Sequence, residues 1–194
     1  MMSRITDRIE HDLGIPALAA TVAERVEPAD LQSLLLDVYR RLAERRPTSA
    51  LLTEYTGNRF VRPAKIPPAQ YIDWDRTAFA HLPVACEAIE LSPVCPLGAS
   101  AAMAGLSQDR VLATIRNTEV ISDSTNVLAL EAAVRRRALK RANARSPEPV
   151  HLAASHRLLR TQSYQNPALS SHFRVFSLCS AGRDRGSFLF ETEA

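Results

Sequence analysis

Cysteine and glycine are scarce in this chain of 194 residues. Its three cysteines, Cys86, Cys95 and Cys179, cannot all pair within one chain and lack CxxC spacing. His151 and His156 are five residues apart, and Cys86 and Cys95 are nine apart, unlike the compact ligand spacings of structural zinc sites. We therefore expect free thiols and no metal site. The six glycines and twelve prolines also exclude a fibrous or low-complexity chain.

Long apolar runs and an excess of one charge are also missing. No run approaches the roughly 18 apolar residues that a membrane span requires, and the N-terminus lacks the apolar stretch of a secretory signal. We expect a cytoplasmic protein without a membrane partner. The 24 Lys and Arg against 21 Asp and Glu give a net charge of +3, which does not indicate a nucleic-acid partner unless cations cluster locally.

The N-terminal part has a helical pattern. Pro16 suits the first turn of a helix, and apolar residues then recur at helical spacing as far as Pro28. A stronger apolar stripe follows and ends at Pro47, with the members Leu31, Leu34, Leu35, Val38, Tyr39 and Leu42. The pattern predicts a helical segment over 1–47 and an α/β domain over 48–194, unless 1–194 forms a single domain.

The middle of the chain alternates breaks and short runs. Glycine and prolines predict a loop over 56–68, whereas 71–81 fits either a helix or a strand. Apolar and β-branched residues predict strands at 84–91 and 110–116. We also expect a turn over 93–98, and a short helix of small residues over 99–106.

A long helix is predicted over 125–144. Ser122, Asp123 and Ser124 supply capping oxygens at its start, and an inward face is expected to contain Val127, Leu130, Val134 and Ala138. Near its end, Arg137, Arg141 and Arg145 stand at i, i+4 and i+8, a spacing that can follow a phosphate backbone. The alternative is a solvated face, because cations favour a helix C-terminus and Glu131 can pair with Arg135.

The C-terminal part is rich in strand patterns, at 150–160, 173–178 and 187–191. The last two patterns predict a hairpin from Phe173 to Glu191. Arg174 would lie on its first strand, and Arg183 and Arg185 in its loop, where guanidinium groups can bind phosphate or carboxylate oxygens. An ordinary surface hairpin with solvated arginines is the alternative.

Polar residues also crowd the junction that leads into the long helix. Arg116, Asn117, Glu119 and Asn126 lie near the predicted helix N-terminus, and helix N-termini attract anions. This junction can position an amino group or a ribose. Capping by Asp123 or Ser124 alone also explains the polarity.

The predicted hairpin resembles the second signature motif of class II aminoacyl-tRNA synthetases, in which a Phe-Arg strand leads through a variable loop to a returning strand with an aromatic and an acidic residue. The resemblance implies that Arg174 contacts the α-phosphate of ATP. It also implies that Arg183 or Arg185 reaches the outer phosphates or an RNA acceptor end. Phe188 or Phe190 would stack on adenine, and Glu191 is the acidic residue. ATP with Mg²⁺ is the implied cofactor, and the implied assembly is a homodimer with a mainly antiparallel sheet flanked by helices.

The chain departs from the family in two places. Phe176 stands where the family usually has an acidic residue, and no glycine-rich third motif with a second phosphate-binding arginine follows. We therefore expect a nucleotide or another anionic ligand to bind without complete aminoacylation, and we assign no catalytic residue. If the chain is an enzyme, the resemblance implies an ATP-dependent ligase fragment or paralogue. The alternative is a non-enzymatic RNA- or protein-binding module that uses the basic helix 125–145.

Overall fold

The computed structural model describes residues 4–143, 145–162, 169–184 and 186–193. The chain divides into two compact units. The first contains the residues up to Ala50 together with Ile115–Asn117, and the second contains the remainder. The elements form a mixed α/β structure whose main sheet contains parallel and antiparallel strands.

The first unit is helical, as its apolar pattern predicts. Its helices are α1 (Arg4–Leu13), α2 (Leu18–Arg25) and α3 (Pro28–Glu44), and α4 (Thr48–Gly57) begins at its end. Pro28 stands in the first turn of α3, where its missing N–H costs no hydrogen bond. On the surface of α3, Asp37 accepts hydrogen bonds from Arg40 and Arg41. No described residue of α1 to α3 is fully buried.

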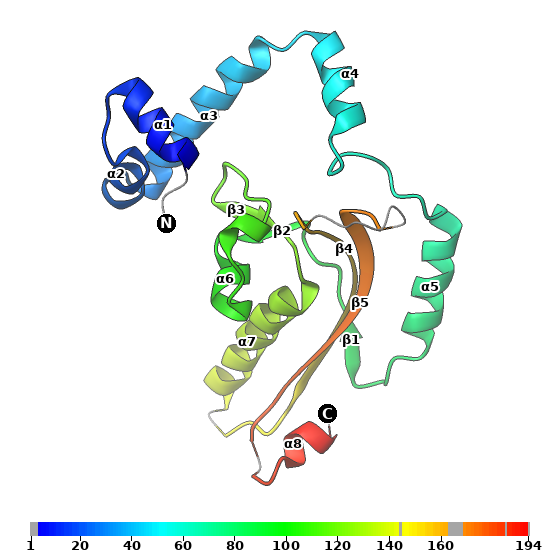
Figure 1. Ribbon diagram of the computed structural model, residues 1–194. Helices are drawn as coiled ribbons and strands as arrows, with labels where there is room; N and C mark the ends of the chain where they lie inside the picture. Colours follow the sequence, from blue (N-terminus) through cyan, green and yellow to red (C-terminus); the bar gives the residue numbers. More distant parts are fainter. Residues whose placement is uncertain (1–3, 144, 163–168, 185, 194) are drawn as a thin grey trace. The chain divides into compact units, whose positions relative to one another are not determined.

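The second unit is built on a three-stranded sheet with the order β1-β4-β5. β1 (Cys86–Ala88) runs parallel to β4 (Val150–Leu159), and β4 pairs with β5 (His172–Ala181) in antiparallel register over ten residues. A separate two-stranded sheet joins β2 (Val94–Pro96) to β3 (Thr118–Val120). Figure 1 shows α7 (Ser124–Ala142) on one side of β4 and β5, and α5 (Pro68–Ala80) on the other. We call these sides the inner face and the outer face.

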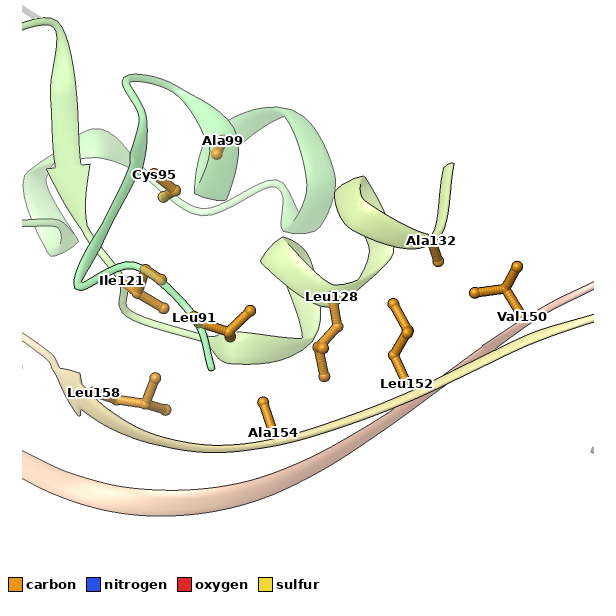
Figure 2. Close-up of a cluster of buried hydrophobic side chains, with 10 residues drawn as sticks. All are labelled: Leu91, Cys95, Ala99, Ile121, Leu128, Ala132, Val150, Leu152, Ala154 and Leu158. Atoms are coloured by element: carbon orange, nitrogen blue, oxygen red, sulfur yellow. The ribbon is translucent and has the colours of Figure 1, made fainter. Parts of the chain in front are cut away.

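The apolar core lies on the inner face. Leu128 of α7 packs with Leu152 and Ala154 of β4, and Ile121 lies near Leu158 (Figure 2). The long helix is confirmed, but the predicted inward face is partly wrong. Val134 and Ala138 are exposed, whereas the fully buried stripe continues from Leu128 through Ala132 to Arg136. The aliphatic part of the Arg136 side chain is buried there. Burial of its charged end is tolerated because the guanidinium donates a hydrogen bond to the carbonyl of Glu148.

The outer face is covered by the segment 71–81, whose sequence fits either a helix or a strand. It forms α5, which starts with Pro68 in its first turn. Tyr71 is the fully buried residue of this helix. Phe79 meets Phe176 of β5 edge to face, with ring centroids 5.1 Å apart.

Three predicted elements are displaced in the structure. The strand predicted at 110–116 is wrong, because the 3-10 helix η1 (Gln108–Arg110) precedes a bridge between Ala113 and Glu119, and the strand β3 lies at 118–120. The chain reverses before β3 at Asn117, whose φ of 54° is left-handed, a conformation that Asn tolerates well. The predicted 84–91 strand is only β1, and the expected turn over 93–98 contains β2. The short helix α6 (Ala99–Ala104) is confirmed.

The hairpin predicted from Phe173 to Glu191 is also wrong. The strands at 150–160 and 173–178 are confirmed, but they pair with each other as β4 and β5. Residues Leu189–Glu193 form α8, a short helix, instead of a returning strand. Phe190 of α8 lies against Gly182, where an added Cβ would come within 2.1 Å of the Phe190 ring. Phe173 and Arg174 thus stand on β5, the second strand of the hairpin that β4 and β5 form, and not on a first strand.

None of the described helices is both long and apolar enough to cross a bilayer.

Candidate anion-binding site on the outer face of the hairpin

The outer face gathers polar side chains from β4 and β5. Side chains alternate between the two faces of a strand, and the core residues Ala154 and Leu158 point inward. Ser155 and Arg157 therefore point outward. In the antiparallel register, Arg157 is directly opposite Arg174 and Ser155 is opposite Phe176.

Arg157 and Arg174 share one aromatic ring. Their Cζ atoms lie 5.2 Å and 5.6 Å from the centroid of Tyr71 on α5. Like charges directly opposite each other on paired strands destabilise a sheet. Contact with the face of an aromatic ring offsets part of that cost, because the ring quadrupole attracts cations. The arrangement still favours a negative charge beside the two guanidinium groups.

Asp75 of α5 supplies one such charge. Its Oδ2 accepts a hydrogen bond from Nη1 of Arg174 at 2.5 Å, and its Oδ1 accepts one from Oγ of Ser155 at 2.5 Å. The Arg174 contact uses one guanidinium nitrogen instead of the two-nitrogen fork that carboxylates commonly receive. Nε of Arg174 is buried and has no hydrogen-bond partner among the described residues. A buried donor without a partner is costly in free energy.

Arg157 has no carboxylate partner in the described part of the chain. Its Nη1 lies 3.1 Å from Nδ1 of His172, and Nε2 of His172 lies 2.6 Å from the carbonyl oxygen of Arg62. Because a carbonyl only accepts, Nε2 carries the proton and Nδ1 accepts from Arg157, so this geometry fits a neutral imidazole. Of the two guanidinium groups, only that of Arg174 pairs with a carboxylate, so the positive charge of Arg157 is not balanced by an ion pair among the described residues.

The predicted loop residues do not gather around Arg174. Arg183 is exposed beyond the far end of β5. Seven strand positions separate Arg174 from Ala181, which corresponds to about 23 Å. Phe188 and Glu191 are exposed, and Phe190 is occupied by its contact with Gly182. Arg185 lies outside the described residues.

The junction before α7 serves largely to hold the fold. Glu119 is fully buried, and its carboxylate accepts hydrogen bonds from the backbone N–H groups of Gly98 and Ser100 and from Gln108. Burial alone would raise the pKa of Glu119, but these hydrogen bonds outweigh it and lower the pKa below its ordinary value. Burial, together with the charge of Glu119, raises the pKa of Cys95 to about 11, so this thiol stays protonated at neutral pH.

The other junction residues are divided between the two units. Arg116 and Asn117 belong to the first unit, where Asn117 donates a long hydrogen bond to the carbonyl of Pro28. Asn126 is buried in the first turns of α7, which covers the inner face, so it lies on the opposite side of the sheet from Arg174. Its Nδ2 has no partner among the described residues. Asp123 caps α7 by accepting hydrogen bonds from Thr125, as predicted for this position.

The basic end of α7 forms a shallow groove of about 460 Å³. Its lining is Ala133, Arg136, Arg137, Lys140 and Arg141. Arg145 does not continue the predicted stripe, because α7 ends at Ala142 and Asn143 is extended. Arg137, Lys140 and Arg141 are exposed and form no ion pair with the described carboxylates.

A second hollow of about 500 Å³ opens between α7 and the strands β1 and β4. Its polar side chains are already engaged. Arg135 pairs with Glu87 and Glu131, and His151 shares a hydrogen bond with Ser180. The outer face of β4 and β5 therefore offers the less satisfied polar groups. No cluster of three or more His, Cys, Asp or Glu side chains suited to a metal ion occurs in the described ranges.

Sequence reasoning identified Arg174 but missed its neighbours Tyr71, Asp75, Ser155, Arg157 and His172. Ser155 and Arg157 carried at most a weak signal, since they flank His156 in a run of three polar residues near the end of a strand. Asp75 carried none, because its partner is 99 residues away.

Similarity to known proteins is found among solved structures. No protein-family model matches the chain, and no curated protein matches it. Among solved structures, the chain is similar to histidyl-tRNA synthetase from Nostoc sp. PCC 7120, with a TM-score of 0.42 and 18% sequence identity over 69% of this chain. The match spans 31% of that synthetase.

Proposed function

We propose that the outer face of β4 and β5 binds a nucleotide or another anionic ligand, without complete aminoacylation. One observation carries the proposal. Arg157 and Arg174 are directly opposed on paired strands and share the ring of Tyr71, and among the described residues only Arg174 has a carboxylate partner, Asp75. An anionic ligand would neutralise the remaining charge and give the buried Nε of Arg174 an acceptor.

Phosphate is the anion that fits this site best. Its oxygens can accept from both guanidinium groups at once, and arginine recognises phosphate through paired donors. Trp74 stands edge-on to Tyr71, with ring centroids 5.7 Å apart, and is half exposed. Its free surface can stack with a base. These features support ATP as the ligand. Mg²⁺ would be bound to the phosphate oxygens of ATP, as is usual for this ion.

Calorimetric titration with ATP and Mg²⁺ tests the proposal. We expect binding by the native protein, and affinity lowered at least tenfold in Arg174→Ala and in Arg157→Ala, because hydrogen bonds to charged groups contribute about 1.5–3 kcal/mol each. Arg183→Ala is the matched control, since it removes the same charge from the other end of β5. No heat at millimolar ATP, or an equal loss in the control, would contradict the proposal.

A second candidate function rests on the groove at the end of α7. Its three exposed cations, Arg137, Lys140 and Arg141, are not neutralised by the described carboxylates and line one concave surface. We propose this groove as the surface of an RNA-binding module, if the outer face proves inactive. Electrostatic contacts to phosphates are the expected source of affinity.

The homodimer implied by the family resemblance stays a prediction. Light scattering coupled to size-exclusion chromatography measures it, with a mass of twice 21.4 kDa expected.

A further inference from the structure

Helix α5 covers the outer face with few apolar contacts. The apolar core cluster lies wholly on the inner face and contains no residue of α5. Tyr71 is fully buried, whereas Ile72 and Trp74 are at least half exposed. Because the free energy of burial scales with the apolar area removed from water, α5 gains little from its apolar side chains. Local opening of such a weakly packed helix costs much less than global unfolding.

The polar contacts of α5 centre on Asp75. Its two carboxylate oxygens engage different partners, Nη1 of Arg174 and Oγ of Ser155. Two oxygens of a phosphate group can accept from the same two donors. Unlike a phosphate of a nucleotide, Asp75 carries a single negative charge and leaves Nε of Arg174 without a partner. Asp75 therefore resembles a ligand anion that satisfies the site incompletely.

We infer that Asp75 is an internal substitute for the ligand's anionic group. In the absence of ligand, α5 holds this carboxylate against Arg174 and closes the outer face. A more highly charged phosphate displaces the Asp75 carboxylate and loosens the packing of α5 on the sheet without removing the helix from the site. This inference rests on the proposed function, because it assigns a regulatory element to the same site.

A supporting role for Asp75 predicts the opposite change in binding affinity. If Asp75 supported Arg174 in its ligand-binding orientation, removing its charge would weaken binding. If Asp75 competes with the ligand, Asp75→Asn strengthens binding. We expect the affinity for inorganic pyrophosphate to rise about tenfold, because the pair is partly exposed and charge-assisted bonds of this kind are modest in strength.

Asp73→Asn is the matched control. Asp73 lies on the same helix and pairs with Arg76, and both side chains are largely exposed. The control removes the same charge from α5 without touching Arg174. Its affinity for pyrophosphate should stay within twofold of the native value, which separates the local effect from the change in net charge.

Hydrogen exchange of the native protein provides a test that needs no variant. Loosening of α5 predicts faster amide exchange over 68–80 when pyrophosphate is added, whereas a helix that clamps the ligand predicts slower exchange. Trp74 is the single tryptophan of the chain and lies on α5. Its emission should change along the same saturation curve, and Asp75→Asn without ligand should already show part of that change.

The outcomes separate the two ideas. Weaker or unchanged binding by Asp75→Asn, or slower exchange of α5 on binding, would overturn the role of Asp75 while leaving the proposed function in place. Tighter binding by Asp75→Asn than by the native protein, together with faster exchange of α5 on binding, would support the inference. If neither protein binds pyrophosphate or ATP in calorimetry, both the inference and the proposed function fail.

Discussion

Arg157 and Arg174 face each other across β4 and β5, and both guanidinium groups lie over the ring of Tyr71. If the two cations bind one anion, as we propose, they act on it as one unit. The effects of removing them should therefore not add. Residues that share a ligand commonly show interaction energies of about 0.5–3 kcal/mol in double-mutant cycles.

The first prediction is such a cycle for pyrophosphate binding. Arg157→Ala and Arg174→Ala should each reduce affinity, and the double variant should lose less free energy than the sum of the two single losses, by at least about 0.5 kcal/mol. Calorimetry of the four proteins measures this. Combining Arg174→Ala with Arg183→Ala should lower affinity no more than Arg174→Ala alone, because Arg183 lies beyond the far end of β5. Additivity in both cycles would show that Arg157 and Arg174 do not share a ligand.

Glu119 gives a prediction about stability. Glu119→Gln removes the charge that accepts from Gly98, Ser100 and Gln108, and places an amide donor among these donors. We expect a loss of about 2–3 kcal/mol in urea unfolding at pH 7. The control Glu24→Gln, at an exposed position of α2, should change stability by less than about 0.5 kcal/mol.

The pH dependence of this effect has a defined sign. The pKa of Glu119 is lowered in the folded state, so its contribution is complete above the ordinary carboxyl value of 4.5 and is lost as pH falls through the folded value. The difference between native protein and Glu119→Gln should therefore shrink below pH 4.5. A difference that stays constant down to pH 3 would show that the charge of Glu119 does not stabilise the fold.

Much of the fold follows from patterns of short range. The stripe from Leu31 to Leu42 predicts α3, and the capping oxygen of Asp123 predicts the start of α7. The residue patterns at 150–160 and 173–178 predict two strands, β4 and β5, but they do not predict that these strands pair with each other. A returning strand was predicted at 187–191 because that run is apolar enough for a strand, whereas the structure has the short helix α8 there, with Phe190 against Gly182.

The candidate site was predicted less completely, because its contacts join distant parts of the chain. Arg174 was identified from its place in a strand. Its partner Asp75 belongs to a segment with no clear periodicity, and the contact between them depends on how α5 packs on the finished sheet. Glu119 was predicted as a ligand contact on the basis of polarity, which does not distinguish an exposed carboxylate from one that is buried and fully hydrogen-bonded.

His156 gives a prediction in a second pH range. It lies on the inner face of β4 and is buried, its Nε2 has no partner among the described residues, and Val175 is directly opposite. Burial lowers its pKa; Arg174 acts in the same direction and Glu90 in the opposite one. Below the ordinary histidine value of 6.5, the unfolded chain therefore takes up a proton that the folded protein does not.

Stability should accordingly fall between pH 6.5 and pH 5, by at most about 1.4 kcal/mol per pH unit. His156→Leu removes both the titration and the unpaired nitrogen, so this part of the pH dependence should disappear. Urea unfolding at several pH values measures it, with His11→Leu as the control at a highly exposed histidine. An equal slope in His156→Leu and in the native protein would rule out His156 as the source.

The groove at the end of α7 gives the last prediction, which concerns RNA. If Arg137, Lys140 and Arg141 each contact a phosphate, the logarithm of the binding constant for a single-stranded RNA should fall with the logarithm of salt concentration with a slope of about −2. The triple variant with glutamine at these positions should lose most of this slope. The control changes Arg25, Arg45 and Arg46 to glutamine, because these exposed residues lie in the first unit. Both variants lower the formal net charge from +3 to 0, since each removes three positive charges. Fluorescence anisotropy across salt concentrations measures the slopes, and an equal loss in both variants would mean that RNA responds to net charge and not to the groove.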